Sequence, residues 1–394
     1  MSVSRRAFVR SLTPRIPSSA SLAARGREAW AAEHFYGEEP QAAAPQGPPP
    51  LRLNSNENPL GPGQSALRAI ERSFAYAGRY PMNARPAMAD FRTLVATRNK
   101  LKIENVALGA GSGEILESAV MAFASKTRGV VSAAPTFESP ARTAKRYQFP
   151  VSEIPVDDMG RLDLDKMIAA SSGAGLVFVC NPNNPTGAAH GAEAISSMVE
   201  RIAKASPDTV ILIDEAYHEY VIDRSYATAI PLVARYPNVL VSRTLSKAHG
   251  MAGLRLGYAV GQADTIAKLA RWTMPYNGNA LAVAAGVASI EDEAQIERER
   301  RRNTEALKFT TDFFRNAGFK TSDSQANFVW VNLRRPAQEF QDACEKQGVL
   351  VGRQFPPFEK THGRISIGTM EEMQRAVSVF RNVLGLTTTT AGGR

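Results

Sequence analysis

The chain has 394 residues, of which 44% are hydrophobic, and a formal net charge of +9 at pH 7. This length and composition suffice for a large core and two or three domains. Six of the nine net positive charges lie within residues 1–27, which contain no acidic residue, so the remainder is nearly balanced. A nucleic-acid-binding surface needs a basic face on the folded body and is therefore not expected. Two cysteines do not make a disulfide framework.

Residues 1–27 form a basic leader rich in arginine and serine. Its string SRRAFVR resembles a twin-arginine export signal, which would place the protein in the periplasm. The uncharged stretch that follows, Ile16 to Ala24, is interrupted by Pro17 and is far too short to span a membrane. The leader is equally compatible with a basic tail that directs no export, and we would then expect a cytoplasmic location.

A Pro- and Ala-rich arm and linker at residues 28–50 separates the leader from the folded body, which we expect to begin near Leu51. The string LRLNSNENPLGP at residues 51–62 alternates in polarity and then breaks on Pro and Gly. This pattern predicts a short strand that enters a turn.

Residues 105–125 predict a strand, a Gly-rich turn and a helix with one apolar face. A helix that begins at Ser112 and Gly113 would direct free backbone N–H groups and its positive dipole end at an anion. The dinucleotide fingerprint requires a third glycine at position 114, where the chain has Glu114. The turn therefore predicts a phosphate cradle, although such turns also serve only to relieve crowding.

Three short apolar runs in the middle of the chain, 176–180, 210–213 and 239–241, each end in polar residues and lie about 30 residues apart. The spacing leaves room for crossover helices and predicts consecutive parallel strands. Ligands bind beyond the carboxyl ends of such strands, where Asn184, Asp214 and Lys247 would converge. From Glu291 to about Asn316 interleaved charges predict a helix with a solvated face.

The strings NPNNPTG, DEAY, SRTLSKAHGMAGLRLG and RISIGT occur in this order. They resemble the pyridoxal-phosphate (PLP) enzymes of fold type I, most closely the histidinol-phosphate aminotransferase group, over residues 51–386. The resemblance implies an α/β fold with a mostly parallel sheet sandwiched by helices and a smaller α+β domain. It divides the chain into a large PLP-binding domain at 51–290, in which 51–62 crosses the active-site mouth, a small C-terminal domain at 291–386 and a tail at 387–394.

The same resemblance assigns the cofactor residues. Lys247 would hold PLP as an imine and carry protons, Asp214 would keep the pyridine nitrogen protonated, and Tyr217 with Asn184 would donate to the phenolic oxygen. Phe137 would stack on the pyridine ring. The phosphate would be held by Ser112, Gly113, Thr244, Ser246 and Arg255, and by Tyr80 of the other subunit, which implies a homodimer with shared sites.

On the substrate side, the resemblance makes Arg364 the residue that clamps an acidic group, with Asn56 and Asn279 as further pocket residues. Arg353 is one position removed from the group's usual arginine, and strand alternation leaves open whether it faces the substrate. The substrate-contacting tyrosine that usually precedes the opening motif has only Tyr36 as a loose counterpart. The five histidines show no metal-ligand spacing, so no metal is expected.

The working hypothesis is a PLP-dependent transaminase that moves an amino group from an amino donor to 2-oxoglutarate, with histidinol phosphate as the leading donor. An aromatic or other amino acid is the alternative donor. A PLP decarboxylase or lyase would keep the same cofactor residues and stays open. A PLP-fold regulator would carry a fused DNA-binding segment, which we do not find, and the glycine pattern disfavours an NAD-dependent oxidoreductase.

Overall fold

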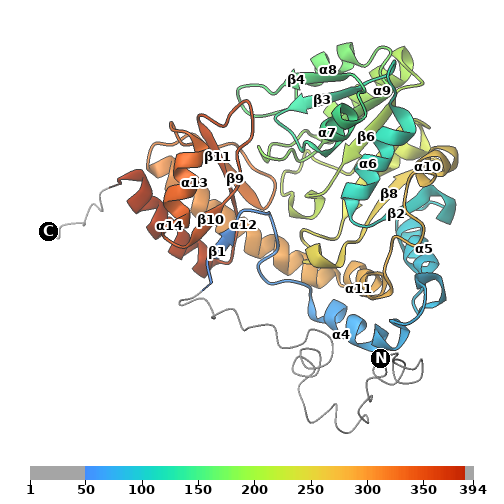
Figure 1. Ribbon diagram of the computed structural model, residues 1–394, viewed down its shortest axis with the longest axis horizontal. Coiled ribbons are helices and arrows are strands. Elements are labelled where there is room, and N and C mark those ends of the chain that lie inside the picture. The colour runs from blue at the N-terminus through green and yellow to red at the C-terminus, as the bar shows by residue number, and fades with distance from the viewer. Residues whose placement is uncertain (1–48, 387–394) are drawn as a thin grey trace, which may run out of the picture. The chain divides into compact units, whose positions relative to one another are not determined.

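The structure, a computed structural model, describes residues 49–386. Expectations for the leader, most of the linker, Tyr36 and the C-terminal tail therefore fall outside the described residues. Two bodies, each with its own hydrophobic core, make up the described part of the chain (Figure 1).

The first, the sheet body, is built on a seven-stranded sheet. Its strands in spatial order are β2 (Val106–Gly109), β8 (Gly257–Gly261), β7 (Val239–Thr244), β6 (Val210–Asp214), β5 (Leu176–Cys180), β3 (Val130–Ala134) and β4 (Val151–Pro155). Strand β8 alone runs in the direction opposite to the other six strands. The three central runs of the sequence are thus adjacent parallel strands, as predicted. Their register aligns Cys180 with Asp214 and Asp214 with Ser242, so the polar ends of β5, β6 and β7 meet at one edge.

Both faces of the sheet are covered by helices, because successive side chains of a buried strand point to opposite faces. In β6, for example, Ile211 and Ile213 join one core cluster and Leu212 joins the other. One face carries α6 (Ser112–Phe123), α7 (Ser139–Arg146) and α10 (Ala263–Ala270). The other carries α5 (Met88–Arg98), α8 (Leu164–Ala170), α9 (Ala192–Ala205) and α11 (Ala280–Glu291), with α4 (Gln64–Ser73) packed on α11. Helix α6 begins at the predicted Ser112.

The second, the C-terminal body, begins with the long charged helix α12 (Glu293–Asn316), which agrees with the predicted solvated helix. It continues with β9 (Phe328–Asn332), α13 (Ala337–Glu345), β10 (Val349–Val351), β11 (His362–Ser366) and α14 (Met370–Leu384). Strands β9 and β11 pair in antiparallel fashion. The core of this body includes Phe380, whose ring contacts the rings of Phe314 and Phe340.

The predicted domain boundaries differ from the structure at the first strand. Strand β1 (Leu51–Leu53), assigned from the sequence to the large domain, pairs in parallel with β10. Leu51 and Leu53 are buried in the core of the C-terminal body, whereas Arg52 between them is exposed. In Figure 1 this blue strand lies among the orange and red elements. The described part of the chain therefore begins in the C-terminal body and then crosses into the sheet body through residues 54–58, which we call the strap.

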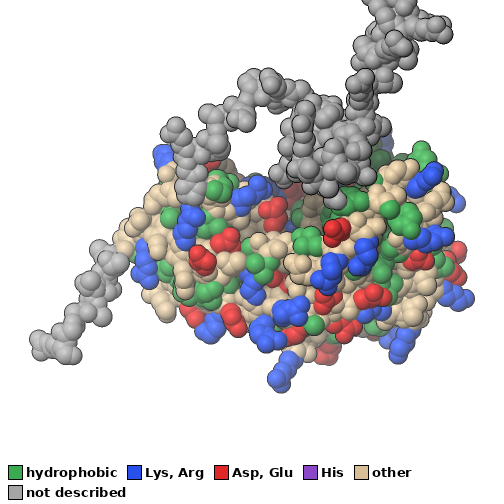
Figure 2. Space-filling view, turned by 90° about the horizontal axis from the view of Figure 1, so that it is seen from below, with side chains coloured by type: hydrophobic (Ala, Val, Ile, Leu, Met, Phe, Trp, Pro, Cys, Tyr) green, Lys and Arg blue, Asp and Glu red, His purple; other side chains and the backbone are tan. Residues whose placement is uncertain are grey.

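Lysine and arginine side chains are interspersed with aspartate and glutamate on the face that Figure 2 shows. Among residues 49–386, no helix combines the length and the apolar character that crossing a membrane requires.

Candidate active site

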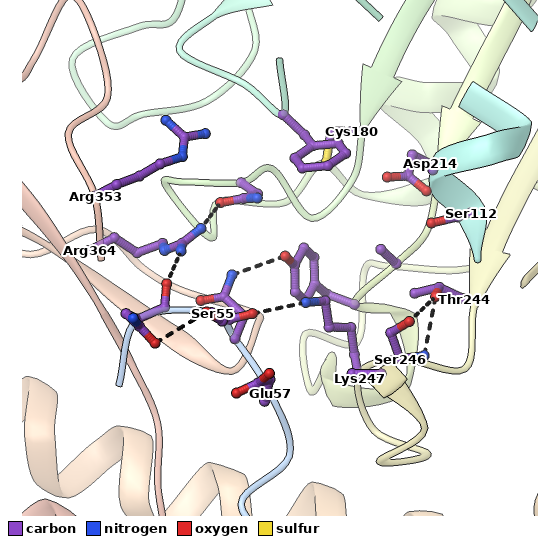
Figure 3. A pocket seen from close by; sticks show the side chains of 18 of the residues that line it. Ser55, Glu57, Ser112, Cys180, Asp214, Thr244, Ser246, Lys247, Arg353 and Arg364 are labelled. Carbon is purple, nitrogen blue, oxygen red and sulfur yellow. Dashed lines mark hydrogen bonds between the residues drawn. The ribbon is translucent and has the colours of Figure 1, made fainter. Parts of the chain in front are cut away.

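A cavity of about 570 Å³ opens at the carboxyl ends of the central strands, between the two bodies and beside the strap. It brings together nearly all of the residues singled out from the sequence (Figure 3). Those that line it are Asn56, Ser112, Gly113, Phe137, Asn184, Asp214, Tyr217, Thr244, Ser246, Lys247, Arg255, Arg353 and Arg364. Because these residues come from segments that lie far apart between positions 56 and 364, the fold itself assembles the site.

Asp214 is the last residue of β6 and is almost completely buried. Its Oδ1 accepts a hydrogen bond of 2.7 Å from the hydroxyl of Ser242 on the neighbouring strand. Burial raises the pKa of Asp214 to about 6, although the Ser242 hydrogen bond acts in the opposite direction. A cationic group in the cavity would hold this carboxyl in its charged form.

Lys247 follows β7 on a short loop and is partly buried. Its Nζ donates to the backbone carbonyl of Ser55 in the strap at 3.2 Å and lies 5.9 Å from the centre of the Tyr217 ring. Burial, together with the positive charge of Arg364, lowers the pKa of Lys247 to about 8. About a tenth of this amine is therefore neutral, and hence nucleophilic, at pH 7, far more than for an unperturbed lysine.

Tyr217 is buried with its ring edge-on to Phe328, and its hydroxyl accepts a hydrogen bond from Nδ2 of Asn56 at 3.0 Å. Burial raises the pKa of Tyr217, so the phenol stays protonated and can donate. Asn56 is held in turn by Ser366, which accepts from the Asn56 backbone and donates to its Oδ1, both at 2.8 Å. The predicted pocket position of Asn56 thus rests on a contact with the C-terminal body.

Hydrogen-bond donors converge at the inner end of the cavity, where α6 begins. Arg255 donates to Oγ of Ser246 at 3.1 Å, and the hydroxyl of Thr244 donates to the same oxygen at 2.9 Å. A Cβ added to Gly111, just before α6, would collide with the guanidinium of Arg255, and the backbone there has a φ of 77°. Glycine is therefore required for Arg255 to approach the helix N-terminus, and the three segments together form an anion cradle.

Arg364 on β11 marks the opposite wall and is only 6% exposed. Its two terminal nitrogens donate to Oδ1 of Asn184 and to the carbonyl of Asn54, both at 2.7 Å. Its Nε has no hydrogen-bond partner among the described residues. A buried guanidinium with an unused N–H group fits the recognition of an anionic substrate group.

Arg353 lies just beyond the end of β10, so the alternation of strand side chains does not decide its direction. It lines the same cavity and forms an ion pair of 2.5 Å with Glu138. The guanidinium groups of Arg353 and Arg364 lie 4.2 and 4.8 Å from the centre of the Phe355 ring. One aromatic ring therefore supports both arginines.

Two expected site residues lie elsewhere. Asn279 is exposed and does not line this cavity, its side chain caps α11 by accepting from the backbone of Ala282, and its assignment to the pocket stays a prediction. The signal was present in the sequence, because asparagine before an apolar helix is a preferred N-cap. Tyr80 is 67% exposed and contacts Tyr276, and its role toward a second subunit stays a prediction.

Sequence reasoning did not single out Asn54 and Ser55, whose backbone carbonyls are used, nor Glu57, Glu138 and Gln341, which line the cavity. Backbone carbonyls leave no residue-type signal, and half-exposed acids resemble ordinary surface residues. Within residues 49–386 no group of His, Cys, Asp and Glu is placed to hold a metal ion.

A mostly parallel sheet whose strand ends present a lysine amine, a buried carboxylate and an anion cradle defines a PLP-dependent enzyme of fold type I. The donor-rich cradle fits the cofactor's phosphate and the carboxylate of Asp214 fits its ring nitrogen. The sequence matches the model of the aminotransferase class I and II family over residues 48–380. The chain belongs to this family and is a PLP-dependent transaminase with amino and keto acid substrates.

A histidinol-phosphate aminotransferase from Bacillus subtilis (strain 168) is 32% identical over 335 residues, which cover 85% of this chain and 91% of the relative. A crystallised protein from Erwinia carotovora atroseptica superimposes with a TM-score of 0.80 at 31% identity, over 84% of this chain and 95% of that one. The histidinol-phosphate aminotransferase from Sinorhizobium meliloti, solved in complex with pyridoxal-5'-phosphate, shares the fold, with a TM-score of 0.79, 22% identity and 98% coverage of both chains.

Proposed function

We propose that this transaminase takes the amino group of histidinol phosphate and passes it to 2-oxoglutarate, as a step of amino-acid biosynthesis. The observation that carries the proposal is the pair of arginines at the outer end of the cavity. Arg364 offers a buried, unused N–H group, and Arg353 lies on the same supporting ring. A phosphate ester carries about two negative charges near neutral pH, which suits two guanidinium groups better than one. The name of the Bacillus subtilis relative points to the same donor.

Lys247 is the residue that we assign to covalent attachment and proton transfer. When bound, PLP supplies an electron sink for the electron pair left as a proton leaves the carbon next to the amino group. The Nζ of Lys247 would accept that proton and return it, since its lowered pKa of about 8 makes both protonation states accessible. The carbonyl of Ser55 orients the amine.

Asp214, Tyr217 and the cradle orient the cofactor in this scheme. The Asp214 carboxylate would hold a proton on the ring nitrogen, with Ser242 fixing its direction. Tyr217, aligned by Asn56, would donate to the phenolic oxygen. Asn184 lines the cavity with its Oδ1 accepting from Arg364, so it would be its amide N–H groups that donate to the phenolic oxygen.

We also propose a homodimer with shared sites. Large apolar side chains are exposed on two neighbouring segments, 80–82 and 272–276, which Tyr80 and Tyr276 connect through rings 5.2 Å apart. The exposed residues are Tyr80, Met82, Trp272, Met274 and Tyr276. Contiguous exposed apolar groups of this size favour burial against another protein, and a second copy would also use Tyr80 as the resemblance implies.

One observation supports a second candidate donor. Arg353 is already paired with Glu138, which leaves Arg364 as the less committed arginine and suits an aromatic or other amino acid with a single carboxylate. A decarboxylase or lyase would not transfer the amino group to 2-oxoglutarate, so no glutamate would form.

The test is a panel of amino donors assayed with 2-oxoglutarate, following the formation of glutamate. We expect histidinol phosphate to have the highest kcat/KM. An inert histidinol phosphate combined with turnover of an α-amino acid would reject the proposed donor, and product without glutamate formation would reject amino transfer to this acceptor.

A further inference from the structure

The outer wall of the cavity contains a pair of opposite charges that the scheme above does not use. Glu138 precedes α7 in the sheet body, and Arg353 follows β10 in the C-terminal body. Their side chains meet at 2.5 Å, with 39% and 51% of their surfaces exposed, and both line the cavity. The carboxylate of Glu138 therefore occupies a position on Arg353 where an anionic substrate group would bind.

Glu138 and Arg353 shift the pKa of Arg364 in opposite directions. The pKa of Arg364 is lowered to about 10, chiefly by burial; the positive charge of Arg353 contributes to this lowering, whereas Tyr217 and the negative charge of Glu138 act against it. The outer end of the cavity thus holds two guanidinium groups and one carboxylate. Its net charge is one positive unit rather than two.

Other roles of Glu138 are weaker. It is the N-cap residue of α7, but its side chain makes no capping hydrogen bond to that helix. A half-exposed ion pair contributes little to the stability of a fold. Glu138 instead lines the cavity itself, as does Phe137 directly before it.

We propose that Glu138 is a specificity-determining residue, which sets the preference of the outer pocket for the charge of the donor by competing with the donor for Arg353. This inference rests on the proposed function. A doubly charged donor must displace Glu138 from Arg353 and then lies beside its carboxylate. A singly charged donor can bind to Arg364 and leave the Glu138–Arg353 pair closed. Because the pair is half exposed, water can solvate Glu138 once it is displaced, so the exchange is energetically accessible.

Three donors test the proposal, since they share an imidazole and an amino group and differ in one substituent. That substituent is a neutral hydroxymethyl group in histidinol, a carboxylate in histidine and a phosphate ester in histidinol phosphate. In Glu138→Gln holoenzyme we expect kcat/KM to rise about 5- to 20-fold for histidinol phosphate, to rise less for histidine and to stay within about twofold for histidinol. The matched control is Glu153→Gln, which removes a glutamate of similar exposure that pairs with Lys145 at 2.8 Å outside the cavity. The control should change none of the three values.

Equal effects of Glu138→Gln on all three donors, or no effect on any, would overturn the proposal. If the wild-type enzyme uses none of the three, the proposed donor fails separately, and calorimetric binding of inorganic phosphate to the two holoenzymes decides the role of Glu138. Tighter phosphate binding by Glu138→Gln than by the wild type supports competition for Arg353. Equal binding rejects it.

Discussion

The amino group of Lys247 donates a hydrogen bond to the backbone carbonyl of Ser55 at 3.2 Å, across 192 positions of sequence. The strap therefore orients the amine before any substrate contact is made. Since the interaction uses a backbone carbonyl, its geometry depends on the path of the strap and not on the side chain of Ser55.

Replacing Lys247 with alanine removes both the attachment point and the acid–base group, so we expect the rate of amino transfer to fall by at least about 100-fold. Borohydride reduction followed by peptide mapping should label Lys247 in the wild type. Lys308→Ala, at an exposed lysine on α12, is the control and should retain full activity and labelling. Borohydride labelling of a lysine other than Lys247 would contradict its assignment as the attachment point.

The pH dependence of cofactor attachment should report the lowered pKa of Lys247. Burial and the charge of Arg364 disfavour the protonated amine, so its neutral form predominates above about pH 8 instead of above the usual value. The rate at which cofactor-free enzyme gains PLP absorbance should rise as pH increases and level off above about 8. A midpoint at the usual lysine pKa of about 10.4 would show that the amine is not perturbed.

For Asp214→Asn we expect turnover to fall far more than cofactor content. A neutral amide can lie against the ring nitrogen but cannot hold a proton there by charge. Turnover and bound PLP per subunit should be measured on the same samples. Asp165→Asn, at an exposed residue paired with Arg201, controls for loss of a carboxylate. If turnover of Asp214→Asn stays within about threefold of wild type, the carboxylate has no electronic role.

The two arginines at opposite ends of the cavity should give opposite phenotypes. Arg255→Ala should weaken PLP retention, whereas Arg364→Ala should raise the KM for substrate and leave the cofactor bound. A charge-assisted hydrogen bond contributes roughly 1.5–3 kcal/mol, so each effect should be about 10- to 150-fold. Dialysis against buffer without PLP and steady-state kinetics separate the two. If Arg255→Ala raised the KM and Arg364→Ala weakened PLP retention, the assignments of the two arginines would be reversed.

Mixed dimers test whether sites are shared. In a dimer of one Lys247→Ala subunit and one Tyr80→Ala subunit, one site carries both substitutions and the other carries neither. Random reassociation of the two inactive variants should then restore up to about a quarter of the wild-type activity. Each variant mixed with itself is the control. Absence of recovery, with dimers confirmed by ultracentrifugation, would place Tyr80 outside the partner's site.

Local patterns accounted for much of the fold. The apolar runs that became β5, β6 and β7 are buried on both faces, and such continuous runs are typical of central parallel strands. The Gly-rich turn before Ser112 likewise predicted the start of α6. The partner of β1 was not predictable in the same way, because alternation of leucine and arginine identifies a half-buried strand but not the sheet that it joins.

The residues of the candidate site were likewise predictable only where local sequence determines their position. Residues next to strand ends, such as Asp214 and Lys247, were placed correctly because strand order determines where they lie. The wall of the cavity opposite these strand ends is formed by contacts between segments that are far apart in the sequence. The residues around Glu138 or around Arg353 alone therefore do not predict that the two side chains pair.

The contact of Asn56 with Ser366 has a consequence for the order of events during synthesis, since 310 positions separate the two residues. Domains generally fold from the N-terminus as the chain emerges, and the strands and cradle of the sheet body all precede residue 262. The strap and the preceding strand β1 are synthesised early. Their partners, Ser366 in β11 for the strap and β10 for strand β1, are synthesised only near the end. The nascent enzyme can therefore build its phosphate cradle well before it can orient Lys247 and Tyr217, and catalytic competence is acquired only with the last elements of the chain.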